Sequence, residues 1–269
     1  MGFIASRRRE LLALLCVFLA GAIMRTLPEL SSPRYPAGYD VPVYVARAEY
    51  LRKDPLDLLR RPYLFHSLLL ALSYLGTDLF LVMKAMAPLL YGSLITSFYI
   101  FLRRGMGWRM DKSLLCALLC ALQPMALTIS WCLFKNELGL ILLFAFLTIL
   151  RGAGRSRWAP LAFLATLTSL SHPFTATMML FAVSAEALRK RKDRCYWSRL
   201  VLCVLPAVCV MGYRALAVEG AVPWISPGND VRPVIWLGER PGSGNPSPLL
   251  RNYLRGEPPS REWGELLIE

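Results

Sequence analysis

The residues best suited to chemistry gather in a polar stretch near the N-terminus, at residues 36–51. Asp40 follows Gly38 and Tyr39, and Tyr44 and Arg47 come shortly after it. A positioned carboxylate can accept a proton in catalysis, and Asp40 lies just past the first apolar run, where an active site at a membrane surface would be. Alternatively, Asp40 only caps a helix that begins near residue 41, because Asp is a favoured N-cap residue.

A second candidate, His172, lies directly before Pro173 inside a long apolar stretch at residues 158–188. Proline breaks a helix, and polar residues at breaks within a membrane are often functional. The alternative is that the imidazole only satisfies backbone carbonyl groups that the break leaves without partners.

Long apolar runs must hold these residues in place. The chain has 269 residues, of which 55% are hydrophobic, and a net charge of +13. About half of its basic residues gather in clusters between apolar runs, at residues 7–9, 103–112, 151–157 and 189–199. This pattern is typical of cytoplasmic loops rather than of a nucleic-acid-binding face. The sequence therefore predicts an all-α, multi-pass protein of the cell membrane, with a cytoplasmic N-terminus and no nucleic-acid partner.

The basic clusters also indicate which apolar runs cross the membrane. Residues 64–75 are too short for a span of about 20 residues, and a crossing there would place the 103–112 cluster outside. We therefore expect an interfacial helix at residues 64–75. Residues 158–188 must form two short helices hinged at Pro173 to return the 189–199 cluster to the cytoplasm. The result is about seven spans, the others at residues 11–24, 79–102, 113–130, 137–150 and 200–218.

Two segments are expected outside the cell. The loop at residues 25–63 contains an amphipathic helix at residues 41–59, which we expect to lie on the outer membrane surface. Its apolar face is predicted to carry Val45, Ala48, Leu51 and Leu58. Residues 221–269 form a tail rich in Pro and Gly. We therefore divide the chain into a transmembrane module, residues 1–220, and an external tail, residues 221–269.

Three segments resemble the GT-C superfamily of membrane glycosyltransferases. Gly38-Tyr39-Asp40, followed by Tyr44, Arg47 and Tyr50-Leu51, is similar to the first-loop motif of the oligosaccharyltransferase catalytic subunits. Residues 83–92 resemble the second span of those subunits. The outer turn Leu133-Phe134-Lys135-Asn136-Glu137 resembles their Phe-Asp-Asn-Glu motif, which also lies between the third and fourth spans. The resemblance covers residues 23–150.

The resemblance implies catalytic roles for Asp40 and Glu137 in sugar transfer from a polyprenyl-phosphate-linked donor. Two departures concern the metal: Lys135 stands where the family has Asp, and no second Asp lies two residues after Asp40. A divalent cation prefers several oxygen ligands, so a metal-independent mechanism is favoured over a metal-dependent one. In such a mechanism Asp40 is the general base, and Lys135, Arg34 and Arg47 bind the donor phosphate. We expect no metal and no other cofactor.

The predicted function is thus a membrane glycosyltransferase at the outer face, with membrane lipids and the lipid-linked donor as partners and an acceptor that the sequence does not identify. The alternative is a non-catalytic polytopic membrane protein, either a transporter or a subunit of an envelope-assembly complex. Transporters place polar residues at the bilayer midplane, whereas here they gather at the outer rim, which favours the enzyme. Relatives in the superfamily are longer, so we expect a short or truncated member.

Overall fold

A computed structural model of the chain describes residues 2–31, 40–60, 62–76, 78–152, 157–214 and 216. Within these ranges all regular secondary structure is helical. Two sequence predictions, the phosphate-binding role of Arg34 and the external tail at residues 221–269, concern residues outside the described part.

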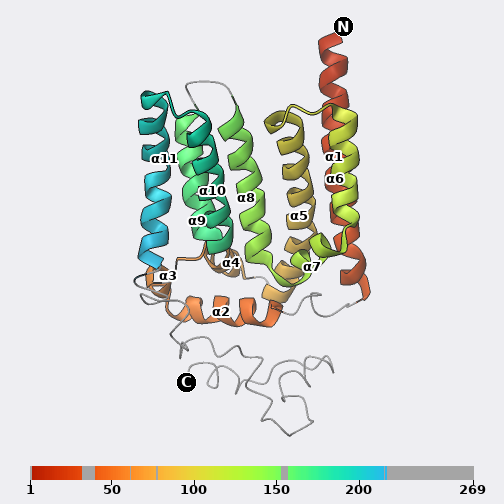
Figure 1. Ribbon diagram of the computed structural model, residues 1–269. Coiled ribbons are helices and arrows are strands. Elements are labelled where there is room, and N and C mark those ends of the chain that lie inside the picture. Colours follow the sequence, from red (N-terminus) through yellow and green to blue (C-terminus); the bar gives the residue numbers. More distant parts are fainter. Residues whose placement is uncertain are drawn as a thin grey trace, which may run out of the picture.

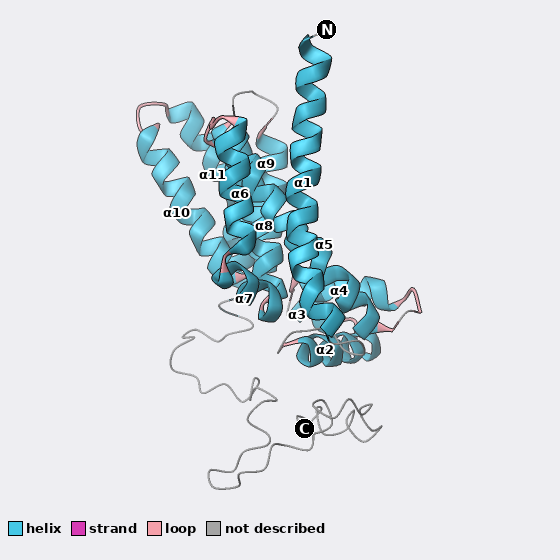
Figure 2. Cartoon of the chain, turned by 90° about the vertical axis from the view of Figure 1, so that its right-hand side faces the viewer, coloured by secondary structure: helices cyan, strands magenta, loops and turns pink. Residues whose placement is uncertain are grey.

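Long helices run lengthwise between two ends of the molecule (Figure 1). Those that run from the N-terminal end are α1 (Gly2–Ser31), α6 (Met110–Leu122), α9 (Trp158–Ser171) and α11 (Arg194–Tyr213). Those that run back toward it are α5 (Leu79–Ile100), which continues into the π-helical turn η1 (Phe101–Gly105), α8 (Phe134–Arg151) and α10 (Pro173–Arg189). The shorter helices α2 (Val41–Lys53), α3 (Asp57–Arg60), α4 (Leu64–Ser73) and α7 (Pro124–Cys132) lie at the opposite end, and Figure 2 shows the same from the side. We call this the α2 end.

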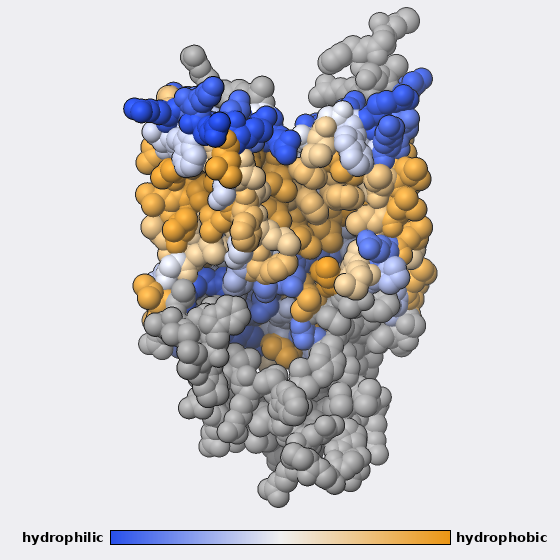
Figure 3. Space-filling view, in the orientation of Figure 1, coloured by the Kyte–Doolittle hydropathy of each residue, from blue (hydrophilic) through white to orange (hydrophobic). Residues whose placement is uncertain are grey.

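The ends of η1, α8 and α10 and the starts of α6, α9 and α11, which carry described residues of three basic clusters, lie together at the N-terminal end, which we call the basic end. An ion pair of 3.0 Å joins Arg104 there to Glu10 of α1. Figure 3 shows hydrophilic side chains at this end and an apolar band below them. The described basic residues that the sequence groups between apolar runs therefore lie at one end of the helix bundle.

Several helices of the described part suit a lipid environment. Three of them are long and apolar enough to cross a membrane: Arg8–Leu30, Leu79–Gly105 and Arg194–Tyr213. Leu12, Leu119 and Leu202 are each more than half exposed, as lipid-facing side chains would be. The described fold is thus all-helical, and its long apolar helices indicate a membrane protein.

The prediction of one continuous helix at residues 113–130 is wrong. The chain forms α6 and then α7, with Gln123 in an extended conformation between them (φ −73°, ψ 126°). Gln123 precedes Pro124, and a residue before proline avoids the helical region because of a steric clash with the proline ring. Pro124 then starts α7, where its missing N–H is not needed.

The predicted outer turn at residues 133–137 is also wrong. The turn is confined to Leu133 (φ −126°, ψ 58°), and α8 already begins at Phe134. Lys135 and Glu137 therefore belong to the first turn of a helix. About 100° of rotation per residue separates their directions by roughly 200°, so the two side chains point to different sides of α8.

The predicted helix at residues 41–59 ends early, at Lys53. Asp54 precedes Pro55 and leaves the helical conformation, and α3 follows as a separate short helix. The predicted apolar face is confirmed for Val45, Ala48 and Leu51, which are all buried. The break predicted at His172 is confirmed as well, because α9 ends at Ser171 and α10 begins at Pro173.

Buried apolar side chains pack the helices of the α2 end against the long helices of the bundle. One buried cluster joins α2 and α4 to α5 and to the start of α8; its members include Tyr44, Phe65, Met83 and Phe134. α1 approaches α5 closely, since a Cβ atom on Gly92 would lie 2.8 Å from the Phe18 carbonyl oxygen. Small residues at helix contacts allow such an approach in membrane proteins.

Candidate functional site

An aromatic cluster forms the frame of the site at the α2 end. The Tyr44 ring of α2 lies edge-on to the rings of Phe65 (5.0 Å between centroids) and Phe134 (5.8 Å). Tyr63, just before α4, meets His66 edge-on at 5.4 Å. Aromatic contacts thus link the segments that carry the predicted site residues.

Lys135 reaches into this frame from the start of α8. Its Nζ atom lies 5.0 Å from the ring centroid of Tyr63 and 5.5 Å from that of Tyr44. Both contacts have cation–π geometry. The hydroxyl of Ser171, at the end of α9, donates a hydrogen bond of 3.0 Å to the Lys135 carbonyl oxygen. The ammonium group therefore contacts rings from two segments, while α9 holds the backbone of Lys135.

Asp40 is half-buried, and the charge of Lys135 acts on it. Burial raises the pKa of its carboxyl group, and the positive charge of Lys135 opposes that rise. The Asp40 backbone carbonyl accepts a hydrogen bond from the Tyr44 amide (3.1 Å), as at any helix start. The side chain makes no capping hydrogen bond, so capping does not account for the carboxylate.

Arg47 lies close to the same cluster but has an acidic partner. Its guanidinium group forms an ion pair with Asp57 of α3 and stacks on the Tyr50 ring, 5.0 Å from the centroid. This pair links α2 to α3. A role for Arg47 in phosphate binding stays a prediction, and the pair with Asp57 would compete with a phosphate.

Both histidines are neutral at physiological pH. Burial lowers the pKa of His66 to about 3, helped by Lys135 and Arg47. Burial lowers that of His172 to about 4, helped by Lys135 and Arg214. His172 Nδ1 accepts a hydrogen bond of 3.2 Å from the Phe174 amide, so it caps α10. This contact supports the structural interpretation of His172, with an amide N–H rather than a carbonyl as its partner.

Arg214, at the end of α11, has no role in the sequence-based site. Only 3% of it is exposed, and its Cζ atom lies 4.2 Å from the ring centroid of Tyr63. Nη1 donates a hydrogen bond of 3.0 Å to the Ser169 carbonyl oxygen of α9. One signal was available: Arg214 is a charged residue inside a predicted span, and such residues are usually functional.

Glu137 does not join this cluster. It is fully buried on another side of α8, where Arg25 and Ser130 are the groups that act on it. Arg25 is also fully buried, forms an ion pair with Glu29, and lies with Cζ 5.9 Å from the Phe134 ring centroid. Burial keeps the Glu137 carboxylate away from any substrate that approaches from the surface. A catalytic role for Glu137 therefore stays a prediction.

The donor set fits a divalent metal poorly. The charge of Lys135 acts on Asp40 and that of Arg25 acts on Glu137, so each carboxylate already lies within electrostatic range of a protein cation. A hard dication needs several oxygen ligands, and these cations would repel it. In the described ranges no three His, Cys, Asp or Glu side chains form a group that could hold a metal ion.

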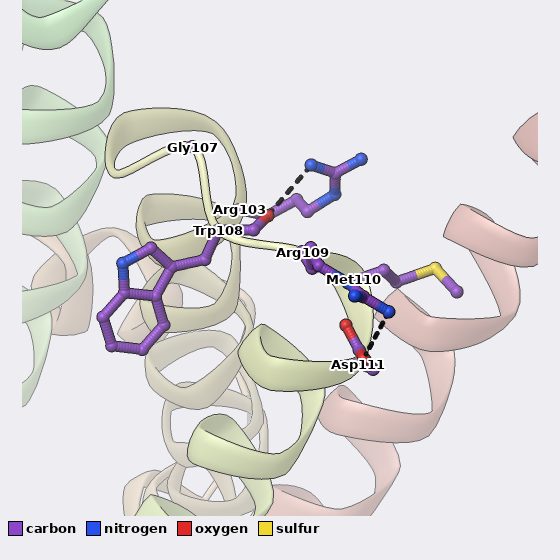
Figure 4. Close-up of a pocket in the computed structure, with 6 residues that line it drawn as sticks. All are labelled: Arg103, Gly107, Trp108, Arg109, Met110 and Asp111. Carbon is purple, nitrogen blue, oxygen red and sulfur yellow. Dashed lines mark hydrogen bonds and ion pairs between the residues drawn. The ribbon is translucent and has the colours of Figure 1, made fainter.

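A hollow of about 420 Å³ lies far from this site, at the basic end between η1 and α6. Arg103 and Asp111 are among its lining residues, and Figure 4 shows how the lining side chains lie around the turn between η1 and α6. The Arg103 guanidinium there donates to the Trp108 carbonyl oxygen (3.0 Å), and Arg109 pairs with Asp111 (3.1 Å). The polar groups of this hollow already have partners, so we assign it no function.

Comparisons with models of protein families, with curated proteins and with solved structures gave no match. The function proposed next therefore rests on the residues of this chain.

Proposed function

We propose that the protein is a membrane glycosyltransferase that transfers a sugar from a polyprenyl-phosphate donor to an acceptor hydroxyl group at the α2 end. The observation that carries the proposal is the Lys135 ammonium group, which lies over the rings of Tyr44 and Tyr63 at the rim of the apolar band, together with the half-buried Asp40 carboxyl group on which the charge of Lys135 acts. A carboxylate and an ammonium group at such a rim suit a reaction between a lipid-anchored donor and a polar acceptor.

In the proposed reaction the acceptor oxygen attacks the anomeric carbon of the donor sugar while Asp40 takes the proton of that hydroxyl group. The bond between the anomeric carbon and the phosphate oxygen breaks, and the lipid phosphate leaves with the electron pair. Lys135 offsets the negative charge that grows on the leaving phosphate. Burial raises the pKa of Asp40 and so makes it a stronger base, while the charge of Lys135 opposes this rise.

For this reaction to face outward, the basic end must lie in the cytoplasm. We infer that α1, α5 with η1, α6, α8, α9, α10 and α11 are the membrane crossings, with the N-terminus inside and the α2 end outside. The positive-inside rule supports this orientation, because described residues of three basic clusters lie together at the basic end. The protein would then belong to the cell membrane, with its tail external.

Cysteine labelling tests the orientation. In a cysteine-free background, Val43→Cys at the α2 end should react with a membrane-impermeant thiol reagent on intact cells. Trp108→Cys at the basic end should react only after lysis. The two side chains are matched, since each is 38% exposed. Reaction of Trp108→Cys without lysis would invert the orientation and remove the active site from the outer face.

A transfer assay tests the function. Full-length protein in lipid vesicles is expected to move sugar from a polyprenyl-phosphate donor to an acceptor in excess EDTA, because Lys135 supplies the charge that a metal would supply. Activity lost with EDTA and restored by manganese or magnesium would contradict the metal-independent scheme but not sugar transfer. Absence of transfer from every lipid-linked donor, by protein that is folded, would favour the non-catalytic alternative, a transporter or a subunit of an envelope-assembly complex.

A further inference from the structure

We propose that Arg214 and Lys135 together bind the phosphate group of a polyprenyl phosphate, with the ring of Tyr63 as their shared support. This inference rests on the proposed function and adds to it a binding residue from the last described helix. The ligand class is a phosphate ester on a long apolar chain.

The first argument is the convergence of two cations on one ring. Lys135 Nζ lies 5.0 Å and Arg214 Cζ 4.2 Å from the Tyr63 ring centroid. The two charges are therefore at most about 9 Å apart, so they repel each other, and both would attract a phosphate group that lies beside the Tyr63 ring. A bound dianion or monoanion would relieve that repulsion. Arg214 offers a planar fork that matches phosphate oxygens, and Lys135 offers a point charge.

The second argument is that one turn of α9 positions both cations. The Ser169 carbonyl oxygen accepts from Arg214 Nη1, and the Ser171 hydroxyl donates to the Lys135 carbonyl oxygen, each at 3.0 Å. A further hydrogen bond of 2.8 Å runs from the Tyr213 hydroxyl to the Leu59 carbonyl oxygen and fixes the end of α11 to α3. Such preorganisation lowers the entropic cost of binding.

The third argument identifies the ligand as a lipid. Near the end of α11 the exposed residues include two leucines: Leu216 is 75% and Leu59 71% exposed. Leu59 is in direct contact with the last turn of α11 through Tyr213. A polyprenyl chain could cover these leucines while its phosphate group lies at Tyr63, whereas a soluble phosphate would leave them in contact with water or lipid.

Binding measurements on the full chain in phosphatidylcholine nanodiscs test the proposal, with decaprenyl phosphate as the probe. Arg214→Gln and Lys135→Gln should each raise the Kd by about 10–100-fold, the range for a lost hydrogen bond to a charged group. The matched control is Arg157→Gln at the basic end. Arg157 also lies over two aromatic rings, those of Trp158 (5.1 Å) and Tyr196 (5.7 Å), and donates to a backbone carbonyl oxygen. Its substitution should leave the Kd unchanged.

Competition identifies the source of the phosphate. Excess phosphatidylglycerol or inorganic phosphate should not displace the probe; displacement by either at a similar concentration would overturn the polyprenyl assignment. Thermal unfolding verifies that each variant is folded, and Arg214→Lys, which keeps the charge but loses the fork, replaces Arg214→Gln if that variant does not fold.

The two proposals can fail separately. If Arg214→Gln binds the probe like the wild type while Lys135→Gln does not, the shared site is wrong and the transferase stands. If both variants lose binding but the wild type transfers no sugar, the phosphate site stands and the transferase is wrong.

Discussion

Asp40→Asn is expected to slow sugar transfer by about 10²–10⁴-fold, the usual contribution of a positioned acid or base. Asn keeps the shape of Asp but cannot take a proton from the acceptor hydroxyl group. The measurement is the initial rate of product formation in vesicles containing saturating lipid-linked donor. Folding should be unaffected, because the Asp40 side chain makes no capping hydrogen bond that Asn would have to replace.

The alternative interpretation of Asp40 gives the opposite pattern. If the residue only started α2, Asp40→Asn would be nearly silent in the rate, and Asp40→Ala would cost about 1 kcal/mol of stability. The pH profile of the wild-type rate provides a further measurement. The rate should fall as the pH drops through the raised pKa of Asp40, because a protonated carboxyl group is no base. Lys135→Gln removes the charge that lowers this pKa, so this fall should begin at a higher pH.

Features that depend on local sequence could be predicted. The described residues of the basic clusters lie at one end of the bundle, as the charge pattern predicts. The break at His172 follows from Pro173, which cannot continue a helix. The buried face of α2 follows from the spacing of Val45, Ala48 and Leu51 at helical intervals.

Features that depend on packing between distant segments could not be predicted from the sequence. A family motif suggested that Lys135 and Glu137 act together, but the start of α8 at Phe134 turns their side chains apart. The contact between Arg214 and Tyr63 joins α11 to the segment before α4, and no sequence pattern relates these two positions. Pro124 does indicate the break between α6 and α7. The prediction missed it because it followed the apolar run at residues 113–130, and apolar character alone does not show where a helix ends.

The second prediction with a large expected effect concerns stability and the buried ion pair of Arg25 and Glu29. Arg25→Met should lower the free energy of unfolding by about 3–5 kcal/mol, the usual cost of removing one partner of a buried ion pair. Arg25 is 0% and the Glu29 side chain 3% exposed, and Arg25 also acts on the buried carboxylate of Glu137. The substitution therefore takes a compensating charge from two buried carboxylates. Reversible unfolding of the full chain in mixed micelles measures the loss.

The matched control is Arg104→Met, which breaks the surface pair with Glu10. There the two side chains are 61% and 34% exposed, so water screens the charges and the cost should stay below about 1 kcal/mol. A loss for Arg25→Met no larger than for Arg104→Met would contradict the importance of the buried network. Adding Glu29→Gln and Glu137→Gln to Arg25→Met should recover much of the lost stability, because neutral amides need no cation.

The same series decides what Glu137 does. If Glu137 acts on the substrate, Glu137→Gln should lose transfer as severely as Asp40→Asn while its unfolding free energy stays near that of the wild type. If it acts through Arg25 on the position of α8, and hence of Lys135, the change should alter stability and leave most of the rate. Its burial beside Arg25, on the side of α8 that Lys135 does not face, leads us to expect the second result. A rate lost without any change in stability would restore Glu137 to the catalytic site.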